Sequence, residues 1–279
     1  MVVRQRGKFV FDGVGLRDNK ELDFASGATM RYGSGYMQGP NPQGGMWANC
    51  PSDSPSNHGE YFFYKEDFLV GSGGGWVITN TSGYARLVNQ ATSGVPAGGV
   101  LLLGLGAQSG NLVTWKANEE TNGGFLQIKS GYPVWYEARW NPVLNTAESW
   151  FVGLIEPAQT AAIGAHGDLA NTSAAIGFHC GQSNGTVVNF VVAASGTATV
   201  IGSSIATETS AEWHTFGFHY DGDDTITPYA DGVAGDTYSR LSGKLTENMT
   251  LVPATSLANF GDAAKTGWLD WVRVVGKRG

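Results

Sequence analysis

The sequence has little of what several large classes of protein require. It contains only two cysteines, Cys50 and Cys180, which lie too far apart in the chain to form a disulfide framework, so we expect free thiols. The longest nearly apolar stretch, Gly98–Ala107, is too short to span a bilayer and indicates a buried strand. The first residues also lack the apolar region that a secretory signal needs. We therefore expect no membrane partner.

Charge is scarce as well. Charged residues make up 15% of the chain, the formal net charge is −7, and no long basic run occurs. A general nucleic-acid-binding surface requires clustered positive charge, so we expect no nucleic-acid partner. The first 31 positions hold six basic residues and are mildly basic, whereas the remainder is acidic.

Glycine and aromatic residues are abundant, and their arrangement predicts an all-β fold. The chain has 41 glycines and nine tryptophans. From Tyr61 onward, short segments with strand periodicity follow one another, separated by Gly, Asn and Ser turns, as in a large sandwich or jelly roll. The one helical candidate, Pro157–Ile163, is no longer than a turn. The predicted strands are Tyr61–Val70, Trp76–Thr79, Tyr84–Asn89, Val100–Leu105, Leu112–Ala117, Gly124–Lys129, Val134–Trp140, Ser149–Ile155, Ala174–Cys180, Thr186–Val192, Ala198–Ile201, Trp213–Tyr220, Thr225–Ala230 and Trp268–Val275.

Residues 1–60 differ in composition and predict an extended N-terminal arm that precedes the sandwich of residues 61–279. Met30–Pro55 is rich in Gly, Pro, Ser and Asn, so it cannot hold a regular element for long. Aromatic and methionine side chains in such a segment need a surface to pack on, either their own domain or a neighbouring subunit. The residues that we expect to serve assembly or docking are Arg4, Arg6, Tyr32, Tyr36, Met46 and Trp47.

Several segments, in this order, resemble the concanavalin A-like lectin/glucanase superfamily. They are EDFLVGSGGGWVITNTSG, VWYEARWNP, SWFVGLIE, AAIGFHC followed by TVVNFVV, EWHTFGFHYDGDDTITPYADGV and GWLDWVRVV. The resemblance implies an all-β, two-sheet antiparallel jelly-roll sandwich. The Gly-rich sequence with its Pro/Gly-rich arm is most similar to virion proteins of tailed phages, which implies an outer, non-catalytic role on a capsid or tail.

Glucanases of this superfamily carry their acids as Glu-x-Asp-x-x-Glu on one strand, where alternate positions share a face. No such run occurs here, since the predicted strands carry Glu66 with Asp67, Glu137 alone and Asp270 alone. No G-x-S-x-G turn is present either. We therefore predict no catalytic residues and no enzyme. The Gly-rich segments are not followed by a helix pattern, so we expect no cofactor.

Two constellations are candidate binding sites. The densest acidic cluster, a weak Ca²⁺ candidate, consists of Asp221, Asp223, Asp224 and Asp231. Its spacing matches no known calcium loop, and turn formation explains aspartates at these positions, so we predict no metal. The second constellation is Trp135, Glu137 and Arg139, which share one strand face and would bind a glycan if that face were exposed. Core packing is the competing interpretation for this tryptophan.

The resulting hypothesis is a non-enzymatic virion structural protein located at the capsid surface. It would be a phage capsid decoration or cement protein whose arm docks on the major capsid protein or another virion protein. We expect a homo-oligomer, and a trimer would suit the local three-fold positions of a capsid. The alternative is a carbohydrate-binding module or tail adhesin that recognises a host surface glycan. A third interpretation is a degenerate glycoside hydrolase that depends on Glu137.

Overall fold

The computed structural model describes twelve stretches of the chain with side chains, except at residues 194, 197, 198 and 249, and it describes those four residues and four short N-terminal strands by their backbone alone. The stretches are 45–47, 50–51, 59–68, 76–88, 99–117, 126–142, 148–163, 174–181, 186–194, 197–208, 212–239 and 249–278. The N-terminal strands are β1 (Val2–Gln5), β2 (Lys8–Phe11), β3 (Lys20–Asp23) and β4 (Thr29–Tyr32). They form two antiparallel pairs, β1 with β2 and β3 with β4, each a sheet of its own.

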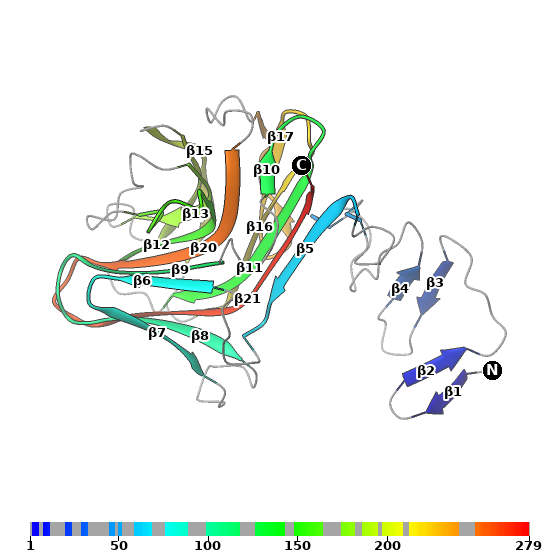
Figure 1. Cartoon of the computed structure of the whole chain (residues 1–279), viewed down its shortest axis with the longest axis horizontal. Coiled ribbons are helices and arrows are strands. Elements are labelled where there is room, and N and C mark those ends of the chain that lie inside the picture. The colour runs from blue at the N-terminus through cyan, green and yellow to red at the C-terminus, as the bar shows by residue number, and fades with distance from the viewer. Residues whose placement is uncertain are drawn as a thin grey trace.

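Two large antiparallel sheets make up the rest of the fold (Figure 1). The first has eight strands in the order β15-β14-β13-β12-β20-β9-β6, with β10 also paired to β20. Its strands are β6 (Trp76–Asn80), β9 (Asn111–Ala117), β10 (Leu126–Ile128), β12 (Glu148–Ile155), β13 (Ala175–Cys180), β14 (Val187–Ala194), β15 (Thr197–Thr207) and β20 (Met249–Asn259).

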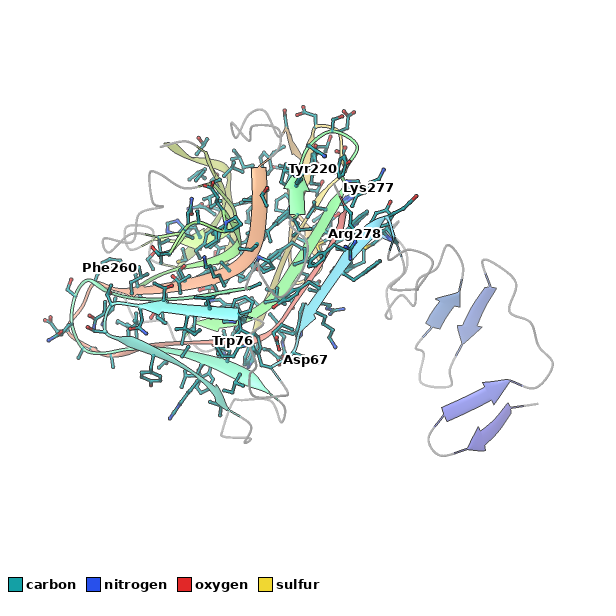
Figure 2. The ribbon with its side chains drawn as sticks, in the orientation of Figure 1. Asp67, Trp76, Tyr220, Phe260, Lys277 and Arg278 are labelled. Atoms are coloured by element: carbon teal, nitrogen blue, oxygen red, sulfur yellow. The ribbon has the colours of Figure 1, made fainter. Side chains whose placement is uncertain are left out.

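The second sheet has nine strands in the order β18-β17-β16-β11-β21-β8-β7, with β19 paired to β17 and β5 to β21. Its strands are β5 (Tyr61–Glu66), β7 (Gly83–Val88), β8 (Val100–Leu105), β11 (Val134–Pro142), β16 (His214–Tyr220), β17 (Thr225–Ala230), β18 (Val233–Ala234), β19 (Tyr238–Ser239) and β21 (Lys265–Lys277). In Figure 2, Arg278 lies beside the start of β5, where its Nε donates to the Tyr61 carbonyl at 3.2 Å.

Large aromatic side chains fill the space between the two sheets (Figure 2). Trp150 of the eight-stranded sheet lies 5.5 Å from Phe216 of the other sheet, ring centre to ring centre, and 6.1 Å from Trp140. All three are fully buried. A buried aromatic ring removes about 150–250 Å² from water, so this core is the main attachment between the sheets. Where a strand is regular, every second residue points into the core and the residues between point outward.

The central strand β20 is missing from the sequence-based list of strands because Pro253 interrupts its pattern. On one side, residues 252–259 pair with β12. On the other side, β10 pairs with residues 249–251 and β9 with residues 254–259, so Val252 and Pro253 are paired with neither strand there. A proline, which has no N–H to donate, is tolerated at this gap.

Part of the outer face of the eight-stranded sheet is covered by the segment Pro157–Ile163. Lys116 of β9 donates to the carbonyls of Pro157 and Gln159 and so holds this segment on the sheet. Ala162 and Ile163 join a second buried apolar cluster on this face. The predicted helical turn is thus a cap on the sheet. Protein, not solvent, occupies this part of the face.

The all-β, two-sheet jelly roll predicted from the sequence is confirmed. Both cysteines are buried, and Cys50 and Cys180 form no disulfide. Within the described ranges, no helix has the length and apolarity needed to cross a membrane.

The close approach of β12 and β13 generates a stability prediction. A Cβ on Gly153 would lie 2.3 Å from the Ile176 carbonyl oxygen and 2.7 Å from the Gly177 Cα. These are backbone atoms of a fully buried strand, so they cannot move aside cheaply. We expect Gly153→Ala to lower the free energy of unfolding by about 1–3 kcal/mol in urea denaturation.

Gly59→Ala is the matched control, because a Cβ there meets nothing within 4 Å. It should change the unfolding free energy by less than about 0.5 kcal/mol. Equal effects of the two substitutions would contradict the packing argument.

Candidate functional site

The outer face of the nine-stranded sheet carries an unusual concentration of tryptophan and arginine. On β11, Tyr136 and Ala138 point into the core, which turns Glu137 and Arg139 outward. The pairing of β11 with β21 shifts register between Arg139 and Trp140, so Asp270 is an extra residue. Since Leu269 and Val272 are both in the core, this bulge turns Asp270 and Trp271 outward together.

We call the resulting group the ladder; it consists of Trp213, Arg139, Asp270, Trp271, Arg273, Glu137 and Trp47. The Arg139 guanidinium lies 4.9 Å from the centre of the Trp213 ring, and its Nη1 donates to Asp270 Oδ2 at 2.6 Å. The Arg273 guanidinium lies 4.1 Å from the Trp271 ring. Arginine stacks on aromatic faces by cation–π attraction, which holds rings and guanidinium groups in fixed alternation.

The last member of the ladder, Trp47, comes from a segment that crosses the sheet, described at residues 45–47 and 50–51, which we call the strap. Its Nε1 donates to Glu137 Oε2 at 3.0 Å, and its ring lies 5.8 Å from the Arg273 guanidinium. Met46 is 5% exposed and sits over Gly217, where a Cβ would lie 2.5 Å from the Met46 sulfur. The glycine thus makes room for the strap.

Glu137 joins the strap to the sheet. Its Oε2 accepts the Trp47 hydrogen bond and lies 3.5 Å from Arg273 Nη2. Burial raises the pKa of Glu137, and the Arg273 charge and the Trp47 hydrogen bond partly offset that rise. The Glu137 carboxylate therefore contacts both the strap, through Trp47, and the neighbouring strand β21, through Arg273.

The three predicted glycan-facing residues have different environments. Trp135 is 3% exposed, stacks on His219 at 4.9 Å and packs in a cluster with Cys50 of the strap. A sugar cannot stack on this ring while the strap is in place. Glu137 and Arg139 do belong to the ladder.

The other members of the ladder on this sheet, Trp213, Trp271 and Arg273, were not among the predicted site residues, although Trp213 and Trp271 lie in predicted strands. The usable signal is the alternation Trp-x-Arg within Trp271–Arg273. This signal is hidden because the bulge adds Asp270 to the strand, so the residues before it lie on the opposite face from the one that strict alternation predicts.

Of the six predicted arm residues, only Met46 and Trp47 have described side chains, and both pack on the protein's own sheet. Arg4 lies on β1 and Tyr32 on β4, where the backbone alone is described. Arg6 and Tyr36 lie outside the described residues.

The acidic hairpin uses its carboxylates to form turns. Asp221 Oδ1 accepts the backbone N–H of Asp223 at 2.8 Å and of Thr225 at 3.1 Å. Burial raises the pKa of Asp221, but these hydrogen bonds outweigh it, and the net shift is downward. Asp231 accepts the Thr215 N–H at 2.7 Å and pairs with His214 at 2.8 Å, and Asp224 accepts the Ser239 hydroxyl at 2.6 Å. In the part of the chain that the structure describes, no group of three or more His, Cys, Asp or Glu side chains could hold a metal ion.

A serine–histidine contact lies on the outer face of the eight-stranded sheet. His179 Nε2 lies 3.1 Å from Ser149 Oγ, and this hydroxyl donates to the Cys180 carbonyl at 2.9 Å. The serine hydroxyl is thus shared between the imidazole and a backbone carbonyl. The pair stabilises the junction of β12 and β13.

Two buried glutamates lie at one end of the sandwich, between the sheets. Glu208 is 1% exposed, and its Oε2 accepts the Trp150 indole N–H at 3.1 Å. Burial raises the pKa of Glu208 to about 9; the Trp150 hydrogen bond lowers it, while the charges of Glu148 and Asp231 raise it. Burial and both glutamates also raise the pKa of the Cys180 thiol to about 12, so this thiol stays protonated. These groups are buried too deeply to meet a polymer.

The chain was compared with known proteins at the levels of family, sequence and structure. No family model matches it, and no curated protein matches it. Peanut lectin aligns over 78% of this chain and 97% of its own with a TM-score of 0.54 and 8% identity. A glycoside hydrolase family 16 endo-glucanase from Bacteroides ovatus aligns over 76% and 99% (TM-score 0.52, 13% identity), and a native glycosidic hydrolase over 76% and 94% (TM-score 0.51, 14% identity).

These similarities confirm the concanavalin A-like lectin/glucanase fold. They contradict the prediction of a non-enzymatic phage capsid decoration protein, because the solved structures that share the fold are mostly glycoside hydrolases, together with a lectin. The prediction that the chain is not an enzyme is contradicted by the same finding. At such low identity the likeness establishes the fold, and the chemistry of this chain depends on its own residues.

The raised pKa of Glu208 generates a prediction about pH. The carboxyl is protonated in the folded state up to about pH 9, whereas in the unfolded chain it ionises near its ordinary value of 4.5. The wild-type protein therefore loses stability as the pH rises between these values. Glu208→Gln keeps an acceptor for the Trp150 N–H. Because an amide does not ionise, this variant does not lose stability in this way as the pH rises. As the pH rises across this window, we expect the unfolding free energy of Glu208→Gln minus that of the wild type to increase by up to about 1.4 kcal/mol per pH unit.

The measurement is urea denaturation at a series of pH values. The control is Glu156→Gln, since Glu156 is an exposed carboxylate, and its stability should follow the wild type at every pH. A difference between Glu208→Gln and wild type that stays constant with pH would show that Glu208 is ionised in the folded protein.

Proposed function

We propose that this protein is carbohydrate-active and binds a polysaccharide along the ladder of the nine-stranded sheet. The single observation that carries the proposal is the row of outward tryptophans, Trp213 and Trp271, each held face-on by an arginine. Sugar rings present apolar C–H faces and polar hydroxyl edges. A surface of flat aromatic faces bordered by fixed hydrogen-bonding groups complements both.

The polar groups of the ladder are fixed before any ligand arrives. Arg139 is held by Asp270 and by the Trp213 ring, and Arg273 by Glu137 and by the Trp271 ring. Side chains that are already ordered lose little conformational entropy on binding. A ligand therefore meets a rigid platform on two adjacent central strands, β11 and β21.

One observation favours hydrolysis as a second candidate function. Glu137 and Asp270 are two carboxylates on one sheet face, in different surroundings: burial raises the pKa of Glu137, whereas Asp270 forms an ion pair with Arg139. Glycoside hydrolysis uses two carboxyl groups held in different surroundings. Release of reducing ends from a bound polysaccharide, lost in both Glu137→Gln and Asp270→Asn, would establish it. Activity that survives both substitutions would place catalysis elsewhere.

Loss of one stacking ring tests the binding proposal. We expect Trp271→Ala to weaken polysaccharide binding at least about tenfold, equivalent to about 1.4 kcal/mol, because it removes an aromatic face and releases Arg273. Binding is measured by affinity electrophoresis against a panel of polysaccharides, followed by calorimetry on any that retard the protein.

Tyr84→Ala is the matched control. Tyr84 is an aromatic side chain of β7 that is 47% exposed and lies outside the ladder. Its removal should leave the affinity within about twofold of the wild type. Failure of the wild-type protein to bind any member of the panel, or equal losses in the two variants, would refute the proposal.

A further inference from the structure

The ladder is rich in arginine, yet its charges cancel. Arg139 pairs with Asp270 at 2.6 Å, and Arg273 pairs with Glu137 at 3.5 Å. Lys65, which lies opposite Arg273 on the neighbouring strand β5, pairs with Asp67 at 3.3 Å. Each cation on this part of the face thus has its own carboxylate, and the sum of these six charges is zero.

In each arginine–carboxylate ion pair, the two side chains differ in their exposed fraction. The Arg273 and Arg139 side chains are 45% and 35% exposed, while those of Glu137 and Asp270 are 15% and 16% exposed. The carboxylates therefore lie beneath the guanidinium groups. A guanidinium has five N–H donors, and a carboxylate partner occupies at most two or so of them. Donors thus remain toward solvent although the net charge is neutralised.

We infer that the ladder binds an uncharged polysaccharide and discriminates against acidic polymers; this rests on the proposed function. Neutral hydroxyl oxygens accept the remaining N–H donors at no electrostatic cost, and the indole faces stack on the sugar rings. A polyanion would have to compete with Asp270 and Glu137 for the same arginines. It would also approach a protein whose formal net charge is −7.

Salt dependence distinguishes the two ligand classes. Binding that replaces counterions on a polyanion weakens steeply as salt rises, whereas stacking and hydrogen bonding to a neutral chain do not. The ladder's charge pairing thus predicts which polymer binds and how that binding responds to ionic strength.

The experiment uses the 279-residue chain and compares its binding to neutral β-glucan, alginate and dextran sulfate by calorimetry at low and high salt. We expect binding to the neutral polymer that changes less than twofold with salt, and at least tenfold weaker binding to the two acidic polymers. Tight, salt-sensitive binding to an acidic polymer without neutral binding would overturn this inference and leave the proposed function intact. No retardation by any polysaccharide of the panel would instead refute the proposed function itself.

A charge variant tests the cause. Asp270→Asn removes the carboxylate under Arg139 and should raise affinity for dextran sulfate at least fivefold at low salt, with the gain lost at high salt. Glu156→Gln is the control, because it changes the net charge equally at an exposed carboxylate outside the ladder. Equal gains in both variants would mean that overall charge, and not pairing within the ladder, excludes polyanions. Should Asp270→Asn fail to fold, the salt series on the wild type decides the question.

Discussion

The burial of large aromatic side chains between the two sheets is the constraint on which the rest of this structure depends. Trp140, Trp150 and Phe216 pack across the interface and are fully buried. Because strand residues alternate between faces, fixing the inward set also fixes what points outward. The outward residues of β11 and β21 form the ladder only because their neighbours are committed to the core. A surface site is thus a consequence of core packing.

The ladder combines this alternation with one local irregularity. The bulge at Asp270 adds a residue to β21, so an acid and a tryptophan face outward together beside Arg139. Glu137 then ties the strap to the sheet through Trp47 and Arg273. The strap in turn buries Trp135. Which aromatic rings a ligand can reach is therefore decided by the bulge and the strap together.

The acids of this chain illustrate how position determines chemistry. On the described strands of the eight-stranded sheet the only carboxylate is Glu148, which is buried at the end of β12. Glu208 is buried nearby, and its raised pKa makes it a neutral hydrogen-bonding group at neutral pH. Glu137 and Asp270 instead lie on the outer face of the nine-stranded sheet, each paired with an arginine. The likeness to glycoside hydrolases and a lectin agrees with a role in carbohydrate chemistry at the level of the fold.

The sequence by itself determined the fold class, because two-residue periodicity and glycine-rich turns are local properties that each segment carries alone. It placed most strands of the two large sheets within a few residues, but it missed the short strands β1–β4, β18 and β19 and the central strand β20. In β20, Pro253 breaks the local pattern but lies where one neighbouring strand pairing is interrupted. Only the tertiary structure decided the site. Whether Trp135 or Trp271 faces a ligand depends on a bulge in a strand pairing and on a strap from about 90 residues away. Such contacts are long-range, and no local pattern encodes them.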